Sequence, residues 1–118
     1  MNTKMTFDQV ENLISKAIML AKANKEIAEF KGRESYYEWP VFRTISETLK
    51  KREGCIADFE AARPKNQFLF SREELEGAIV VGHGRSGHQS SENWTTVKIG
   101  TTTFSDGNFM NLPYIKVA

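Results

Sequence analysis

The sequence has very little cysteine: Cys55 is the only one among 118 residues. No disulfide can form within the chain, which is typical of proteins from a reducing compartment. Long apolar runs are also missing, and none approaches the roughly 20 residues that a transmembrane helix needs. The residues up to Lys4 lack the apolar segment of a secretory signal. We therefore expect a cytoplasmic protein with no membrane association.

An excess of charge of one sign is missing as well. The formal net charge is +1, whereas a DNA mimic would be strongly acidic and a nucleic-acid-binding domain is commonly basic. We therefore do not expect a nucleic-acid partner. Histidine is scarce: His83 and His88 are the only two, and Glu92 is the acidic residue nearest to them. A closed zinc site needs more ligands than these, so we expect no metal and no cofactor.

Length and composition fit one globular domain. The chain has 118 residues, of which 40% are hydrophobic and 26% charged, the profile of an ordinary folded protein. We expect a single domain over residues 1–118, with a helical half at 1–64 and a β-rich half at 65–118.

Two long helices are predicted in the first half. Thr6 and Gln9 have the spacing of a capping box, and apolar residues then recur at helical intervals. The first helix is predicted from Thr6 to Lys31, with Gly32 as its C-terminal cap. The second is predicted from Pro40 to about Ala62, and the apolar phase is kept across Gly54, which favours one continuous helix.

Short strands separated by turn residues are predicted in the second half. Apolar and polar residues alternate from Trp94 to Ile99, as in a half-buried strand, and Asp106-Gly107 is the strongest hairpin-turn dipeptide in the chain. The fold class is therefore predicted as α+β: an N-terminal antiparallel pair of long helices followed by a small antiparallel β-meander of three or four strands. The predicted strands are 78–82, 94–99, 101–105 and 109–117, with a short strand or buried edge at 68–70 and a capped helical turn at 71–77.

The stretch from Gly82 to Ser91 is the candidate site, and we predict a loop there. Its start, G-H-G-R-S-G, matches the dinucleotide-binding fingerprint after a strand. That fold needs a helix next, but a strand is predicted instead, so we exclude it. Glycine amides and Arg85 could still hold a phosphate or carboxylate, and the alternative is a connecting loop without a ligand. The candidate ligand-binding residues are Gly84, Arg85, Ser86, Gly87, His83, His88, Asn93 and Trp94.

A cluster of aromatic residues lies between the two predicted helices: Tyr36, Tyr37 and Trp39. It is a candidate interface, because aromatic residues are enriched in binding hot spots; the alternative is a plug between the helix pair and the sheet. Ile18 and Met19 widen the apolar stripe of the first helix, which favours contact with more than one neighbour. We therefore expect self-association as a homodimer or a higher oligomer.

Three functions are compatible with these features. The first is a small non-enzymatic binding protein that inhibits a partner protein, such as an anti-defence accessory protein of a phage or mobile element. The second is a protein that binds or sequesters a phosphate-bearing small molecule such as a nucleotide through the 82–91 loop. There, Trp94 or Phe104 would stack on the base, and Arg72 would add a polar group. The third is a phosphodiester-acting enzyme with His83 and His88 as base and acid. The sequence assembles no convincing catalytic site, which favours the first.

Overall fold

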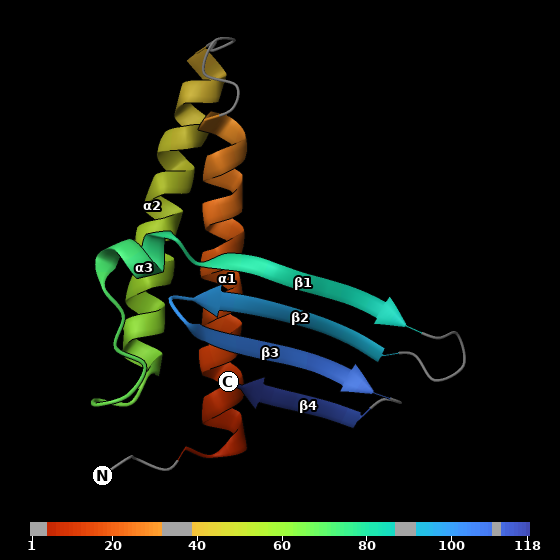
Figure 1. Cartoon of the computed structure of the whole chain (residues 1–118). Coiled ribbons are helices and arrows are strands. Elements are labelled where there is room, and N and C mark those ends of the chain that lie inside the picture. The colour runs from red at the N-terminus through yellow and green to blue at the C-terminus, as the bar shows by residue number, and fades with distance from the viewer. Residues whose placement is uncertain (1–4, 32–38, 87–91, 110–111) are drawn as a thin grey trace.

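The computed structural model describes residues 5–31, 39–86, 92–109 and 112–118. Long helices are followed by a four-stranded antiparallel sheet, which confirms the predicted α+β fold (Figure 1). No helix in these ranges is both long enough and apolar enough to cross a membrane. The elements are α1 (Phe7–Lys31), α2 (Trp39–Ala62), α3 (Arg72–Glu76), β1 (Ile79–Ser86), β2 (Glu92–Ile99), β3 (Thr102–Phe109) and β4 (Leu112–Val117).

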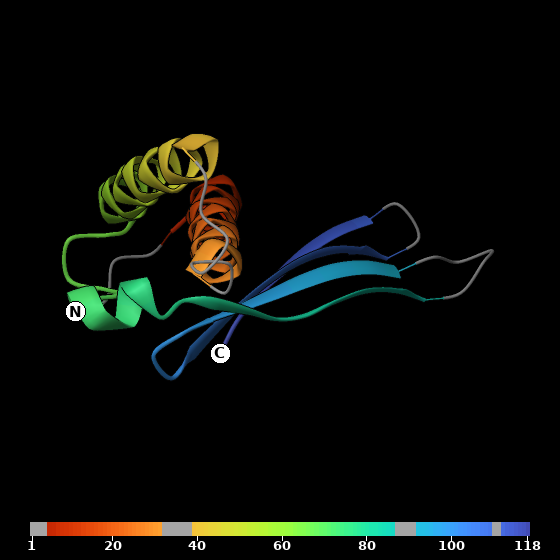
Figure 2. The same cartoon turned by 90° about the horizontal axis from the view of Figure 1, so that it is seen from above.

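Helix α1 lies between helix α2 and the sheet (Figure 2). Its N-terminus has the predicted capping box: the backbone N–H of Thr6 donates to Gln9 Oε1 at 2.9 Å, and the backbone N–H of Gln9 donates to Thr6 Oγ1 at 3.2 Å. Leu13, Ile14 and Leu20 are fully buried. The apolar stripe of α1 thus meets two neighbours within the same chain. Of the two residues predicted to widen it, Ile18 packs against the core, whereas Met19 is 43% exposed. Self-association stays a prediction.

Helix α2 is continuous through Gly54, as predicted. Glycine in a helix costs on the order of 1 kcal/mol relative to alanine. The residues that follow it, Cys55, Ile56 and Phe59, are buried against the rest of the core, and this burial outweighs the cost. The predicted cap of α1, Gly32, lies outside the described residues.

The sheet is a meander in which each strand pairs with the next along the chain, in the order β1-β2-β3-β4. The reversal between β2 and β3 comes at Gly100, where a break was predicted, and its φ of 59° is in the left-handed region that glycine tolerates. Pro113 lies in β4, an edge strand, where a residue without a backbone N–H is tolerated because one side of the strand has no ladder partner within the described structure.

The predicted hairpin turn at Asp106-Gly107 is wrong. Both residues lie within β3 and pair with β2 on one side and with β4 on the other. Phe109 still pairs with Leu112, so β3 extends beyond the predicted turn as far as Phe109. The longer strand keeps Phe104 opposite Val97, both fully buried, and it is paired along its length. Burial of these side chains and pairing with both neighbouring strands outweigh the local turn preference of the dipeptide.

The predicted loop at Gly82–Ser91 is wrong for its first half. Strand β1 continues to Ser86, and residues 82–86 pair with residues 92–96 of β2. A one-residue irregularity between Val80 and Gly82 shifts the register, as in a β-bulge. Ladder hydrogen bonds come from the backbone alone, so glycine-rich sequence can pair when a neighbouring strand is in place. The rest of the predicted loop, 87–91, lies outside the described residues.

Residues 68–70 form no strand, and in place of a buried edge two of them, Phe68 and Phe70, are partly buried against the core. The rings of Phe68 and Phe70 pack against Phe104, with centroid distances of 5.6 and 6.3 Å. Leu69, between them, is 64% exposed. Phe68 has a φ of 57°, which is incompatible with a strand. The segment inserts aromatic side chains into the core instead of extending the sheet.

Candidate functional site

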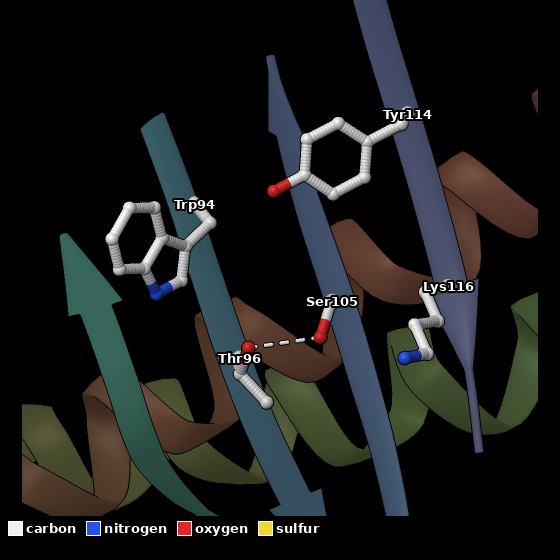
Figure 3. Close-up of a pocket in the computed structure, with 5 residues that line it drawn as sticks. All are labelled: Trp94, Thr96, Ser105, Tyr114 and Lys116. Carbon is white, nitrogen blue, oxygen red and sulfur yellow. Dashed lines mark hydrogen bonds between the residues drawn. The ribbon is translucent and has the colours of Figure 1, made fainter. Parts of the chain in front are cut away.

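The face of the sheet that points away from the helices carries an open pocket of about 330 Å³ (Figure 3). This volume is in the range of sites that hold small molecules. The alternation predicted for residues 94–99 is confirmed, because Val97 and Ile99 are buried on the helix side, whereas Trp94 and Thr96 line the pocket and Lys98 is exposed. The lining residues are Trp94, Thr96, Ser105, Tyr114 and Lys116.

The strand register arranges the pocket in two rows across the sheet. In the first row Trp94 of β2 pairs with Gly107 of β3, and Gly107 pairs with Tyr114 of β4. Gly107 has no side chain and is itself buried. Figure 3 shows the Tyr114 ring with its hydroxyl directed over β3. The first row is therefore an aromatic row to which β3 adds only backbone.

The second row is polar. Thr96 of β2 pairs with Ser105 of β3, and Ser105 pairs with Lys116 of β4. The hydroxyl oxygens of Thr96 and Ser105 are 2.8 Å apart and share one hydrogen bond. Lys116 is exposed, and its ammonium group is directed toward β3 (Figure 3). Hydroxyl groups and a positive charge thus lie side by side next to the aromatic row.

Two glycines of the predicted loop lie beside this pocket. Gly84 pairs with Trp94 and Gly82 pairs with Thr96, and the Trp94 indole extends toward β1 (Figure 3). A Cβ added at Gly82 would meet no atom within 4 Å. An aromatic residue beside a glycine on the neighbouring strand covers the exposed backbone there. The glycine pattern of β1 therefore leaves room for the indole.

The other candidate residues of the Gly82–Ser91 stretch lie either in β1 or outside the described residues. His83 and Arg85 belong to β1, where they pair with Thr95 and Asn93, in the register positions that alternate with the pocket rows. Ser86 ends β1. Ligand binding by these residues stays a prediction. Two further candidates, Gly87 and His88, lie outside the described residues.

The predicted aromatic interface falls largely outside the described residues, because Tyr36 and Tyr37 lie in the range 32–38. Trp39 begins α2. Their role as an interface or as a plug stays a prediction.

Two side chains proposed to contact a ligand are occupied elsewhere. Phe104 is fully buried in the core, so the prediction that it stacks on a base is wrong. Arg72 forms ion pairs with Glu53 of α2 and Glu76 of α3, in the helical part of the molecule. Hydrogen bonds from Arg72 hold the pKa of the Glu53 and Glu76 carboxyls below their ordinary value. Arg72 therefore joins α3 to α2 and is not part of the pocket.

Among the described residues, no group of three or more His, Cys, Asp or Glu side chains is placed to hold a metal ion.

Sequence reasoning found Trp94 but missed the rest of the pocket. Thr96 was correctly placed on the same face as Trp94, but the predicted hairpin at residues 106–107 gave β4 the wrong register. Tyr114 and Lys116 were therefore not aligned with β2. A signal for these residues is present in the sequence, because the two residues of each strand are two positions apart. The pairs are Trp94 and Thr96, Ser105 and Gly107, and Tyr114 and Lys116.

The chain was compared with known proteins at three levels. No family model, no curated protein and no solved structure matches it.

Proposed function

We propose that the protein is a non-enzymatic binding protein that holds a small molecule with a planar ring on the open face of its sheet. The observation that supports this proposal is the row Trp94, Gly107 and Tyr114, in which two aromatic side chains flank a residue without a side chain. Stacking of a ring on an aromatic side chain contributes about 1 to 3 kcal/mol. The proposal keeps the predicted class of ligand but moves its site from the 82–91 stretch to the sheet.

Binding without turnover is favoured by the chemistry of the lining residues. Ser105 and Lys116 are neighbours across two strands, which is the pair of residue types found in serine–lysine hydrolases. A lysine acts as a base when it is removed from water, whereas Lys116 is exposed. The Ser105 hydroxyl bonds to Thr96. The pair therefore lacks the features of a nucleophile and its base, and the protein acts by keeping its ligand from other molecules.

The proposal can be tested by the fluorescence of Trp94. The chain has two tryptophans, so Trp39→Phe makes Trp94 the sole reporter. Titration with nucleosides and nucleoside monophosphates is expected to change this fluorescence saturably and to raise the melting temperature. Tyr114→Ala should weaken the binding about tenfold, because one stacking wall is lost. Phe7→Ala, which removes an exposed aromatic side chain of α1, is the matched control. If none of the nucleosides and nucleoside monophosphates changes the Trp94 fluorescence saturably, the proposal is rejected.

Antagonism of a protein partner is a second candidate, favoured by the exposed edge of the sheet. Strand β1 is paired on one side only within the described structure, and Ile79 and Val81 in it are 53% and 48% exposed. An open edge with apolar residues is suited to pairing with an extended segment of another protein. With a purified target, Val81→Lys should abolish this mode of binding, whereas Tyr114→Ala should leave it intact. If instead Tyr114→Ala abolishes binding and Val81→Lys leaves it intact, the target binds at the pocket and not at the edge of β1.

A further inference from the structure

We infer that the ligand of the open-face pocket is a nucleoside monophosphate, with its base in the aromatic row and its phosphate at Lys116. This inference rests on the proposed function, because it names the class of molecule that the pocket accepts. The observation behind it is that the aromatic row and the polar row lie next to each other. Flat apolar groups lie on one side of the pocket, and hydrogen-bond donors with a positive charge lie on the other.

The distance between the rows sets the shape of the ligand. Trp94 precedes Thr96 by two residues on β2, and Tyr114 precedes Lys116 by two residues on β4. A strand rises about 3.4 Å per residue, so the rows are about 7 Å apart. A molecule that uses both rows must therefore carry its ring and its anionic group at opposite ends of a short spacer. The ribose of a nucleoside monophosphate is such a spacer.

The aromatic row gives a planar ring two surfaces on which to stack. Figure 3 shows the Trp94 indole extended toward β1 and the Tyr114 ring lying over β3. A ring in van der Waals contact with an aromatic face lies about 3.5 Å from it. A base on the open face can therefore contact aromatic side chains of β2 and β4, while β3 adds only the backbone of Gly107 to this row.

The polar row offers donors to an anion. In the hydrogen bond between Thr96 and Ser105 one hydroxyl donates and the other accepts, so the hydrogen of the accepting hydroxyl remains for a ligand. Lys116 adds a charged donor, and hydrogen bonds from charged groups to phosphate are among the stronger ones. Of the described residues that line the pocket, Lys116 is the charged one, so no lining carboxylate opposes a phosphate.

A second lysine supplies the matched control. Lys98 lies two residues beyond Thr96 on β2 and pairs with Thr103. It is exposed and does not line the pocket. Replacing Lys98 changes the net charge of the protein by the same amount as replacing Lys116. A difference between the two variants therefore reports contact at the pocket and not the overall charge.

The experiment uses the full chain with Trp39→Phe and titrates the four ribonucleoside 5′-monophosphates, the corresponding nucleosides and inorganic phosphate. At least one monophosphate should bind more than tenfold more tightly than its nucleoside, and phosphate alone should bind weakly. Lys116→Gln should weaken the binding of that monophosphate roughly tenfold or more, as expected for loss of a hydrogen bond from a charged group. The same variant should leave the affinity for the nucleoside unchanged. Lys98→Gln should leave the affinities for both molecules unchanged.

The results separate this inference from the proposed function. Equal binding of nucleoside and monophosphate, or equal effects of Lys116→Gln and Lys98→Gln, would overturn the inference while binding of a ring on the open face still stood. Absence of any response would overturn both. Tyr114→Ala gives a second readout: it should weaken the binding of nucleoside and monophosphate together, because Tyr114 lines the pocket, whereas Phe7→Ala should not. If Tyr114→Ala does not fold, the two lysine variants still decide.

Discussion

The side-chain amide of Asn24 in α1 donates a hydrogen bond to the backbone carbonyl of Ala78 at 3.0 Å. The same nitrogen donates to the carbonyl of Leu75 at 3.1 Å. The Leu75 carbonyl lies in α3 and the Ala78 carbonyl directly precedes β1, and Asn24 is only 9% exposed. One buried amide therefore fixes the point at which the sheet leaves the helical part of the molecule.

We expect Asn24→Ala to destabilise the protein by about 1 to 3 kcal/mol, because buried carbonyl groups lose a donor that water does not replace. The free energy of unfolding in urea measures this loss. Asn12→Ala is the matched control, since Asn12 is an exposed asparagine of the same helix, and it should change stability by less than about 0.5 kcal/mol. Equal effects of the two variants would show that the Asn24 hydrogen bonds contribute nothing measurable.

Alanine at two glycines should change stability in opposite directions. At Gly100 the φ of 59° disfavours alanine, and its Cβ would clash with the side-chain carboxylate of Glu74. That carboxylate also accepts the capping hydrogen bond of Ser71, so we expect Gly100→Ala to cost about 1 to 3 kcal/mol. At Gly54 a Cβ meets nothing within 4 Å, and Gly54→Ala should stabilise by about 0.5 to 1 kcal/mol. Urea midpoints of the two variants test both signs, and a stabilised Gly100→Ala would contradict the observed turn.

The helical half could be predicted from the sequence because its signals are local and agree with one another. The capping box at Thr6, the apolar spacing of α1 and the unbroken phase across Gly54 each predict the same structure. The second capping box, at Ser71, was predicted for the same reason and is present. Where local preference and the apolar pattern coincide, tertiary contacts do not need to be known.

The sheet and its site could be predicted only in part, because strand register depends on partners that are distant in sequence. Asp106-Gly107 resembles a turn locally, but pairing with both neighbouring strands holds it inside β3. The glycines at 82 and 84 resemble a loop, but β2 is in place to pair with them. The pocket is a product of this register, so its residues on β3 and β4 could not be identified before the register was known.

The pH dependence of stability should contain a contribution from Asp106. This residue pairs with Thr95 and Ile115 in register, and burial raises the pKa of its carboxyl above the ordinary value, although a hydrogen bond from the N–H of Gly107 opposes the shift. The folded protein therefore binds this proton more tightly than the unfolded chain does. The contribution of Asp106 to the free energy of unfolding must therefore decrease as the pH rises from the ordinary pKa of aspartate to the raised pKa.

Asp106→Asn removes this titration, so the variant should become more stable relative to the unmodified protein as the pH rises through that window. Melting temperatures at closely spaced pH values between about 3 and 7 measure the effect. Asp58→Asn, which replaces an exposed aspartate of α2, is the control for the change of net charge. A stability difference that is constant over the window would contradict a raised pKa at Asp106.

Cys55 should react slowly with thiol reagents in the folded protein. Its side chain is only 4% exposed, and burial raises the pKa of the thiol, which lowers the fraction of reactive thiolate. Modification then needs local opening, and an opening free energy of about 3 kcal/mol slows it on the order of a hundredfold. Mass spectrometry after timed exposure to iodoacetamide at pH 8, in buffer and in denaturing urea, gives the two rates. Comparable rates would mean that the packing of α2 against α1 opens freely, which would contradict the burial of Cys55 in the core.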